Sequence, residues 1–305
     1  MTWGAIVVAA GHGTRFGRPK QLIAIAGRPM VAWSIDAFAS MAEIAELVVV
    51  TEPEHVEAMQ QLADERVIHG SVTVVRGGAT RQASARAGLD ALSEDVTAVL
   101  VHDGARPLVR TADVRDGMRP VRPGIASLLA AQIVDTVKVA GPDGKVTRTL
   151  DRSELWVAQT PQFAMLADLR RAHADAARRG ETAVTDDAAL LERAGCDVLL
   201  VPANHDNFKV TVPEDLTRAE AVLRERGDQS AEEDMLVVEC FVDPTAVDAV
   251  LLELEARAAR VDEIDRDLPS AAVVRAYLTN AALRGFGARL QAVAGANAMY
   301  TVTKH

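Results

Sequence analysis

Short apolar runs alternate with longer amphipathic stretches through the first two-thirds of the chain. Runs typical of buried strands occupy residues 5–10, 47–51, 72–76, 98–102 and 125–130. Apolar positions recur every three or four residues, as in helices, at 30–40, 54–65, 82–92 and 111–119. This alternation predicts an α/β fold, a doubly wound and mostly parallel sheet covered by helices on both faces. In such sheets ligands bind beyond the carboxyl ends of the strands.

The alternation is interrupted at residues 133–150. Two β-type runs, 134–139 and 146–150, flank the sequence GPDG, which strongly favours a turn. We therefore expect a β-hairpin arm that projects from the sheet. A two-stranded hairpin is marginal alone, so it is expected to pack against a second subunit. Beyond it the pattern predicts a strand at 198–201 and helices at 165–179, 186–194 and 213–226.

A short polar segment, GDQSAEED at 227–234, ends this pattern. We expect a first domain over residues 1–227, a linker over 228–234 and a second domain over 235–305. The second domain has the order strand, helix, strand, strand, helix, strand, which predicts a small α+β ferredoxin-like unit. Its elements are expected at 236–242, 245–260, 261–265, 273–278, 281–293 and 298–303.

Composition narrows the class of protein. The net charge of −10 argues against a general nucleic-acid binder, although a local basic pocket is compatible with it. No apolar run approaches the roughly 18 residues of a membrane span, and the N-terminus lacks the basic region and cleavage site of a secretory signal. Cys196 and Cys240 form neither a metal spacing nor a disulfide framework. We expect a reduced, cytoplasmic protein.

The most informative stretch is AAGHGTRFGRPKQL at residues 9–22. Gly11 and Gly13 stand where the first strand ends, and three cations, Arg15, Arg18 and Lys20, follow them. Glycines let backbone N–H groups approach a ligand closely, and cations suit phosphate. The loop is therefore predicted to hold a triphosphate. The alternative is an ordinary strand-to-helix turn with solvated charges.

Two better-known phosphate motifs are excluded in this loop. The dinucleotide fingerprint needs a third glycine where Phe16 stands. The P-loop needs Gly-Lys followed by Ser or Thr, whereas Pro19 precedes Lys20 and Gln21 follows it.

Three further segments are expected to meet this loop at the same sheet edge: GGATRQAS at 77–84, HDGARP at 102–107 and NHDNFKV at 204–210. Asp103 is a candidate metal-binding carboxylate, because it follows a buried strand directly. Each segment also has a simpler interpretation. Gly77-Gly78 could be an ordinary turn, Asp103 could cap a turn, and Lys209 could be a solvated surface cation. His102 and His205 are expected to pack or hydrogen bond rather than to bind metal.

Residues 4–226 resemble the 2-C-methyl-D-erythritol 4-phosphate cytidylyltransferases. The resemblance rests on separated motifs in order: AAGHGTRFGRPKQL, GGATRQAS, HDGARPLV, DTVK, LDRSELWVAQTPQ, TDDA and NFKVTVPEDL. It implies a transferase of isoprenoid biosynthesis that joins CTP to the phosphate of methylerythritol phosphate and releases pyrophosphate. It also implies a Mg²⁺ ion or another divalent cation, and a homodimer in which the hairpin arm embraces its partner.

The same resemblance assigns residues to the site. The CTP site would comprise Ala9, Ala10, Gly11, Gly13, Gly78, Arg81 and Ser84. Arg15, Lys20 and Lys209 would be the catalytic cations. Asp103 would bind the metal, with Asp206 as a second carboxylate. Substrate-binding residues would be Asp103, Arg106, Thr136, Arg152, Thr160 and Thr185, of which Thr136 and Arg152 would serve the neighbouring subunit.

The tail resembles the last domain of elongation factor G through VVRAYLTNAALRGFGARLQAVAGANAMYTV. The chain has no P-loop, so GTPase activity is not implied. Two alternatives stay open at this point. The enzyme could act on another polyol phosphate such as ribitol 5-phosphate, or the chain could be a binding protein tethered through its tail, with catalysis secondary.

Overall fold

The computed structural model describes residues 1–11, 16, 19–64, 70–182, 184–233, 235–257, 259–266, 271–279, 282–283 and 285–304. The chain divides into two compact units, Met1–Val222 and Leu223–His305. Helix α7 (Pro213–Glu233) runs across this division and continues through most of the segment expected to be a linker. The polar sequence there therefore forms helix.

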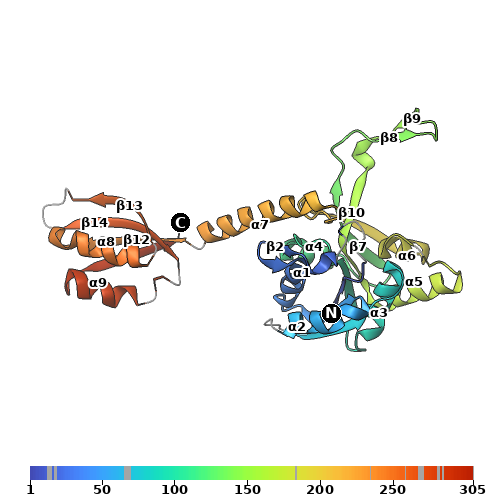
Figure 1. Cartoon of the computed structure of the whole chain (residues 1–305), viewed down its shortest axis with the longest axis horizontal. Coiled ribbons are helices and arrows are strands. Elements are labelled where there is room, and N and C mark those ends of the chain that lie inside the picture. Colours follow the sequence, from blue (N-terminus) through green and yellow to red (C-terminus); the bar gives the residue numbers. More distant parts are fainter. Residues whose placement is uncertain are drawn as a thin grey trace. The chain divides into compact units, whose positions relative to one another are not determined.

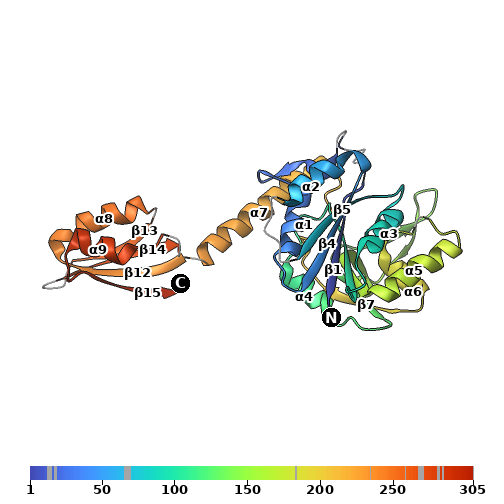
Figure 2. The ribbon, with the colours of Figure 1, turned by 90° about the horizontal axis from the view of Figure 1, so that it is seen from below.

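The first unit is built on a seven-stranded sheet (Figures 1 and 2). Its strand order is β11-β7-β10-β6-β1-β4-β5. The strands are β1 (Trp3–Val8), β4 (Ile44–Thr51), β5 (Ser71–Arg76), β6 (Ala98–Asp103), β7 (Ile125–Gln132), β10 (Trp156–Met165) and β11 (Asp197–Pro202). All neighbouring pairs are parallel except those of β10, which is antiparallel to β6 and β7. The predicted, mostly parallel sheet is confirmed.

Helices cover both faces of this sheet, as the doubly wound prediction requires (Figure 2). Ala5 and Val7 of β1 pack with α1 (Met30–Ala39), α2 (Val56–Asp64) and α4 (Thr111–Met118). Ile6 and Val8 pack on the other side with α3 (Arg81–Ala91), α5 (Leu166–Arg178) and α6 (Asp187–Arg193). Because successive side chains of a strand point to opposite faces, a strand buried on both sides reads as one continuous apolar run.

Strand β10 is the strand of the seven-stranded sheet that sequence patterning missed. Its centre, Gln159 to Gln162, is polar and includes Pro161, which cannot donate to a ladder. The ladder with β7 accordingly shifts register between Ala158 and Gln162. The polar side chains are nonetheless buried, because Gln162 Nε2 donates to Asp186 Oδ2 (3.0 Å) and Gln159 Nε2 to the Asn204 carbonyl (3.2 Å).

The predicted hairpin arm is present and projects from the unit (Figure 1). Its strands, β8 (Lys138–Ala140) and β9 (Val146–Thr149), form a separate antiparallel sheet. The first strand begins later than the apolar pattern suggests. A smaller two-stranded sheet pairs β2 (Ala24–Ile25) with β3 (Arg28–Pro29), and short 3₁₀ helices lie at Lys20–Leu22, Pro53–His55, Arg152–Glu154 and Pro244–Ala246.

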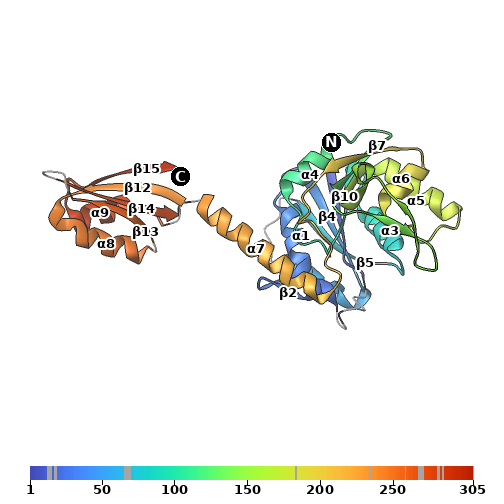
Figure 3. The same cartoon turned by 90° about the horizontal axis from the view of Figure 1, so that it is seen from above.

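The second unit holds a four-stranded antiparallel sheet of order β13-β14-β12-β15. Its elements are β12 (Met235–Val242), α8 (Val247–Ala256), β13 (Arg260–Asp265), β14 (Ala272–Thr279), α9 (Phe286–Ala294) and β15 (Met299–Lys304). Both helices lie on one face (Figure 3), where Val250 and Phe286 pack with Val238, Cys240 and Val274. None of the helices in the described part of the chain combines the length and apolar character that crossing a membrane requires.

Candidate active site

A pocket lined by charged and small apolar residues lies beyond the carboxyl ends of the parallel strands, with about 470 Å³ of empty space that is partly open to solvent. Its wall is formed by residues from four distant segments: Val8, Ala10, Gly11, Lys20, Gln21, Arg81, Ser84, Asp103, Ala105 and Lys209. The first glycine-rich loop therefore meets all three segments that the sequence analysis expects at this edge.

Asp103 is held by ionic contacts on both carboxylate oxygens. It ends β6, and its Oδ1 accepts from Arg81 Nε (2.9 Å) while its Oδ2 accepts from Lys209 Nζ (2.8 Å). Burial by itself would raise the pKa of this carboxyl, but the charges of Arg81 and Lys209 outweigh it and hold the pKa well below the ordinary value. Asp103 is thus ionised at neutral pH.

The segment 77–84 brings Arg81 and Ser84 to the pocket. Thr80 caps helix α3 by accepting from the Ala83 N–H through Oγ1 (3.1 Å). Ser84 Oγ donates to the Thr80 carbonyl (3.0 Å) and accepts from the Gly78 N–H (3.2 Å). The loop lies so close to the first strand that a Cβ on Gly77 would come within 2.4 Å of Ala10 Cβ. A glycine is therefore required there.

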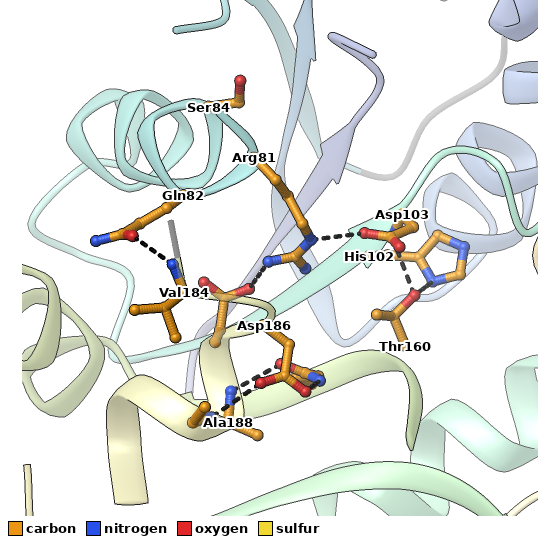
Figure 4. A network of polar contacts seen from close by, with 12 residues as sticks. Arg81, Gln82, Ser84, His102, Asp103, Thr160, Val184, Asp186 and Ala188 are labelled. Carbon is orange, nitrogen blue, oxygen red and sulfur yellow. Dashed lines mark hydrogen bonds and ion pairs between the residues drawn. The ribbon is translucent and has the colours of Figure 1, made fainter. Parts of the chain in front are cut away.

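His102 supports the site from within the core (Figure 4). Burial lowers its pKa to about 4, so the ring is neutral at pH 7. Its Nε2 lies 3.1 Å from the Arg106 carbonyl, which can only accept, so the hydrogen is assigned to Nε2. Nδ1 then accepts from Thr160 Oγ1 (3.1 Å), which itself accepts from the Asp103 N–H (3.0 Å). The prediction that His102 packs and hydrogen bonds is confirmed.

Other predicted residues lie on or beside the pocket wall. Lys20, in a short 3₁₀ helix, donates to the Val210 carbonyl (3.2 Å). Arg106 Nη1 donates to the Asn207 carbonyl (2.7 Å), and burial lowers the pKa of its guanidinium. Ala9 is buried directly before the pocket residue Ala10. Arg15 and Gly13 lie outside the described residues.

Besides Ala9, Gly78, Arg106 and Thr160, four further predicted residues are absent from the pocket lining. Thr136 and Thr185 are exposed on segments that precede β8 and α6. Arg152 lies at the base of the arm, where its guanidinium donates to the Val134 carbonyl (2.6 Å). Asp206 pairs instead with Arg110 (3.1 Å). Among the described residues of one chain, these four therefore do not form part of the pocket wall.

The donor set fits a magnesium ion held together with phosphate rather than a closed protein cage. The described residues include no group of three His, Cys, Asp or Glu side chains that could hold a metal ion. Among the described residues that line the pocket, Asp103 is the one carboxylate. Mg²⁺ is commonly bound through one or two carboxylates plus substrate phosphates, so Asp103 alone fits that role.

Three residues of this region went unassigned in the sequence analysis. Gln21, 5 % exposed, lines the pocket. Asp187 and His173 are buried behind Arg81 and contact each other at 3.1 Å. Asp187 stands within the motif TDDA, which was the available signal. Only the packing of α6 against α5, and the reach of Arg81 from α3, reveals its partners.

A doubly wound sheet with a charged, glycine-lined pocket at its carboxyl edge defines a protein of the α/β nucleotide-binding class. A family model described as 2-C-methyl-D-erythritol 4-phosphate cytidylyltransferase matches residues 4–225. The chain belongs to this family of CTP-dependent nucleotidyltransferases. The resemblance inferred from the motifs of the first domain is confirmed.

Individual relatives agree with the family model. Those named 2-C-methyl-D-erythritol 4-phosphate cytidylyltransferase include one from Prochlorococcus marinus (strain MIT 9313), 42% identical over 220 residues, or 72% of this chain and 96% of the relative. One from Pelotomaculum thermopropionicum is 40% identical over 231 residues, or 75% of this chain and 97% of the relative. The crystal structure of the enzyme from Thermus thermophilus matches with a TM-score of 0.60 at 32% identity, over 72% of this chain and 98% of that one.

Proposed function

We propose that this chain transfers the cytidylyl group of CTP to 2-C-methyl-D-erythritol 4-phosphate and releases pyrophosphate, in the non-mevalonate route to isoprenoid precursors. Family membership supports the reaction, and one observation about the chain itself carries it. Lys20, Arg81, Asp103 and Lys209 come from four distant segments and line one pocket at the sheet edge where α/β proteins bind nucleotides.

On this proposal the glycine-rich segments hold the nucleotide. Backbone groups around Ala10 and Gly11 would lie against CTP, together with Ala9, Gly13, Gly78, Arg81 and Ser84. Lys20 and Arg15 would bind the triphosphate. The close approach of Gly77 to Ala10 supports this assignment, because it places the two glycine-rich segments side by side at the sheet edge.

The chemistry needs positioning and charge rather than an enzyme nucleophile. A phosphate oxygen of the substrate attacks the α-phosphorus of CTP, and the bond from that phosphorus to the bridging oxygen breaks. Pyrophosphate leaves with the electron pair. The attacking phosphate is already ionised, so no strong general base is required. Lys20 and Lys209 would stabilise the charge that develops on the phosphoryl oxygens. A Mg²⁺ ion held by Asp103 would neutralise phosphate charge.

The acceptor substrate would bind on the side of Arg106, Thr160 and Lys209, with Thr185 nearby. Thr136 and Arg152 would reach it from the arm of a partner subunit in a homodimer. Two features of the described structure support this arrangement. Both residues stand apart from the chain's own pocket, and the arm exposes Val146 (60 %) and Val134 (67 %).

The second unit is proposed to be a ferredoxin-like domain similar to the last domain of elongation factor G. Its strand order, with both helices on one face, supports the fold. The described residues that line the pocket all belong to the first unit, so the role of the second would be interaction with a partner. The two free, buried cysteines support a reducing, cytoplasmic environment.

The direct test is pyrophosphate release by the purified chain with CTP, Mg²⁺ and methylerythritol phosphate. We expect turnover that requires all three components. Ribitol 5-phosphate serves as the matched alternative acceptor. Efficient turnover of ribitol 5-phosphate without any turnover of methylerythritol phosphate would overturn the substrate assignment.

A further inference from the structure

The guanidinium of Arg81 is held between two carboxylates (Figure 4). Its Nε donates to Asp103 Oδ1 (2.9 Å), and its Nη1 donates to Asp187 Oδ2 (2.8 Å). The third nitrogen, Nη2, is buried and has no hydrogen-bond partner in the described part of the chain. Arg81 therefore contacts each carboxylate through a single nitrogen.

Asp187 is deeply buried and does not line the pocket. It is the first residue of α6, where the positive end of the helix dipole favours a carboxylate. Its Oδ1 lies 3.1 Å from His173 Nε2 on α5. Burial would raise the pKa of Asp187, but the charge of Arg81 and the hydrogen bond from His173 outweigh it and keep the pKa lowered. A buried negative charge thus stands behind Arg81.

The contact between Asp187 and Arg81 determines which nitrogens of Arg81 bind Asp103. Arginine binds a lone carboxylate preferentially through two parallel N–H···O bonds. Because Nη2 has no partner among the described residues, Arg81 could bind both oxygens of Asp103 through Nε and Nη2. That geometry would compete with Lys209 for Oδ2, which accepts from Lys209 Nζ at 2.8 Å. The ionic contact of Asp187 with Nη1 opposes the rotation of the guanidinium that this two-nitrogen geometry would require.

We propose that Asp187 is a positioning residue for the reaction: it holds Arg81 in its single contact with Asp103, and so keeps the second oxygen of Asp103 available to Lys209 and to ligand. His173 orients the Asp187 carboxylate. This inference rests on the proposed function, because Arg81, Asp103 and Lys209 belong to the pocket assigned to CTP and the acceptor phosphate.

The test is steady-state kinetics of the full chain carrying Asp187→Asn, which keeps the shape of the side chain and removes its charge. We expect kcat/KM for CTP to fall at least tenfold, at a temperature where circular dichroism shows the variant folded. If the amide variant does not fold, Asp187→Ser replaces it, since it is smaller and still polar. The matched control is Asp168→Asn on α5, whose carboxylate bonds Gly124 N (2.8 Å) and Arg171 (3.1 Å) away from the pocket. It should leave kcat/KM within twofold.

A double-mutant cycle separates positioning from a merely structural role. If Asp187 acts through Arg81, Asp187→Asn should cost nothing further in kcat/KM once Arg81 is changed to Ala. An equal loss with and without Arg81, or an unchanged kcat/KM in a folded single variant, would overturn the inference. Failure of the unmutated chain to turn over CTP with methylerythritol phosphate would instead overturn the proposed function.

Discussion

Lys20 and Lys209 reach one pocket from opposite ends of the first unit's sequence. We predict that Lys20→Ala and Lys209→Ala each lower kcat by about 10²–10³, because each removes a preorganised charge from the phosphoryl transfer. Circular dichroism should show unchanged folds, since both side chains lie at the pocket wall rather than in the core. Near-normal turnover of either variant would show that the lysine is a solvated surface cation without a catalytic role.

Asp103 is the single carboxylate that the described part of the chain brings to the pocket wall. Replacing it with Asn keeps its size and removes the charge that would hold a divalent cation. We predict that Asp103→Asn raises the Mg²⁺ concentration needed for half-maximal rate. An unchanged Mg²⁺ dependence, measured by pyrophosphate release across a titration, would contradict the metal role.

His102 links folding stability to pH. Its pKa is lowered to about 4 in the folded protein, against about 6.5 for an unperturbed histidine. The unfolded chain therefore binds a proton more readily, and stability falls as the pH drops from 6.5 toward 4. One pKa unit corresponds to about 1.4 kcal/mol. Titration of His102 should therefore lower the free energy of unfolding by about 2 kcal/mol between pH 7 and pH 5.

Urea denaturation at these two pH values measures the effect. His102→Gln retains an amide donor for the Arg106 carbonyl and cannot titrate, so its stability should change less over this range than that of the unmutated chain. Parallel losses in both proteins would assign the pH dependence to other groups.

At the scale of elements, the hairpin arm formed by β8 and β9 is too small to be stable on its own. In the part of the chain that the structure describes, its two short strands pair only with each other, and it exposes apolar side chains. We predict that replacing residues 138–149 with a short Gly-Ser linker yields a folded monomer with strongly reduced kcat. Sedimentation velocity and circular dichroism provide the measurements. A dimer that keeps full turnover would show that the arm neither joins subunits nor completes the site.

For the whole molecule, the division into two units predicts that the first unit folds and catalyses the reaction without the second. The pocket and both apolar clusters of the seven-stranded sheet lie within Met1–Val222. A truncation after Arg226 shortens α7 and keeps these features, so we predict that it folds and retains its turnover. The comparison is kcat and sedimentation against the full chain. Loss of turnover in a folded truncation would mean that the second unit completes the active site.

The sequence by itself determined the parallel sheet, its covering helices and the four segments that form the pocket. These features follow from local patterns: continuous apolar runs mark strands buried on both faces, and glycines with cations mark a phosphate loop. Family membership was equally accessible, because ordered motifs carry it.

Only the tertiary structure decided how polar residues are paired inside the protein. Strand β10 escaped prediction because Gln159, Thr160 and Gln162 become acceptable in a core only when distant partners satisfy them. The contact of Arg81 with Asp187 spans 106 positions of sequence. No local pattern encodes such a pairing, since the free energy of a buried charge depends on the groups that the fold brings beside it.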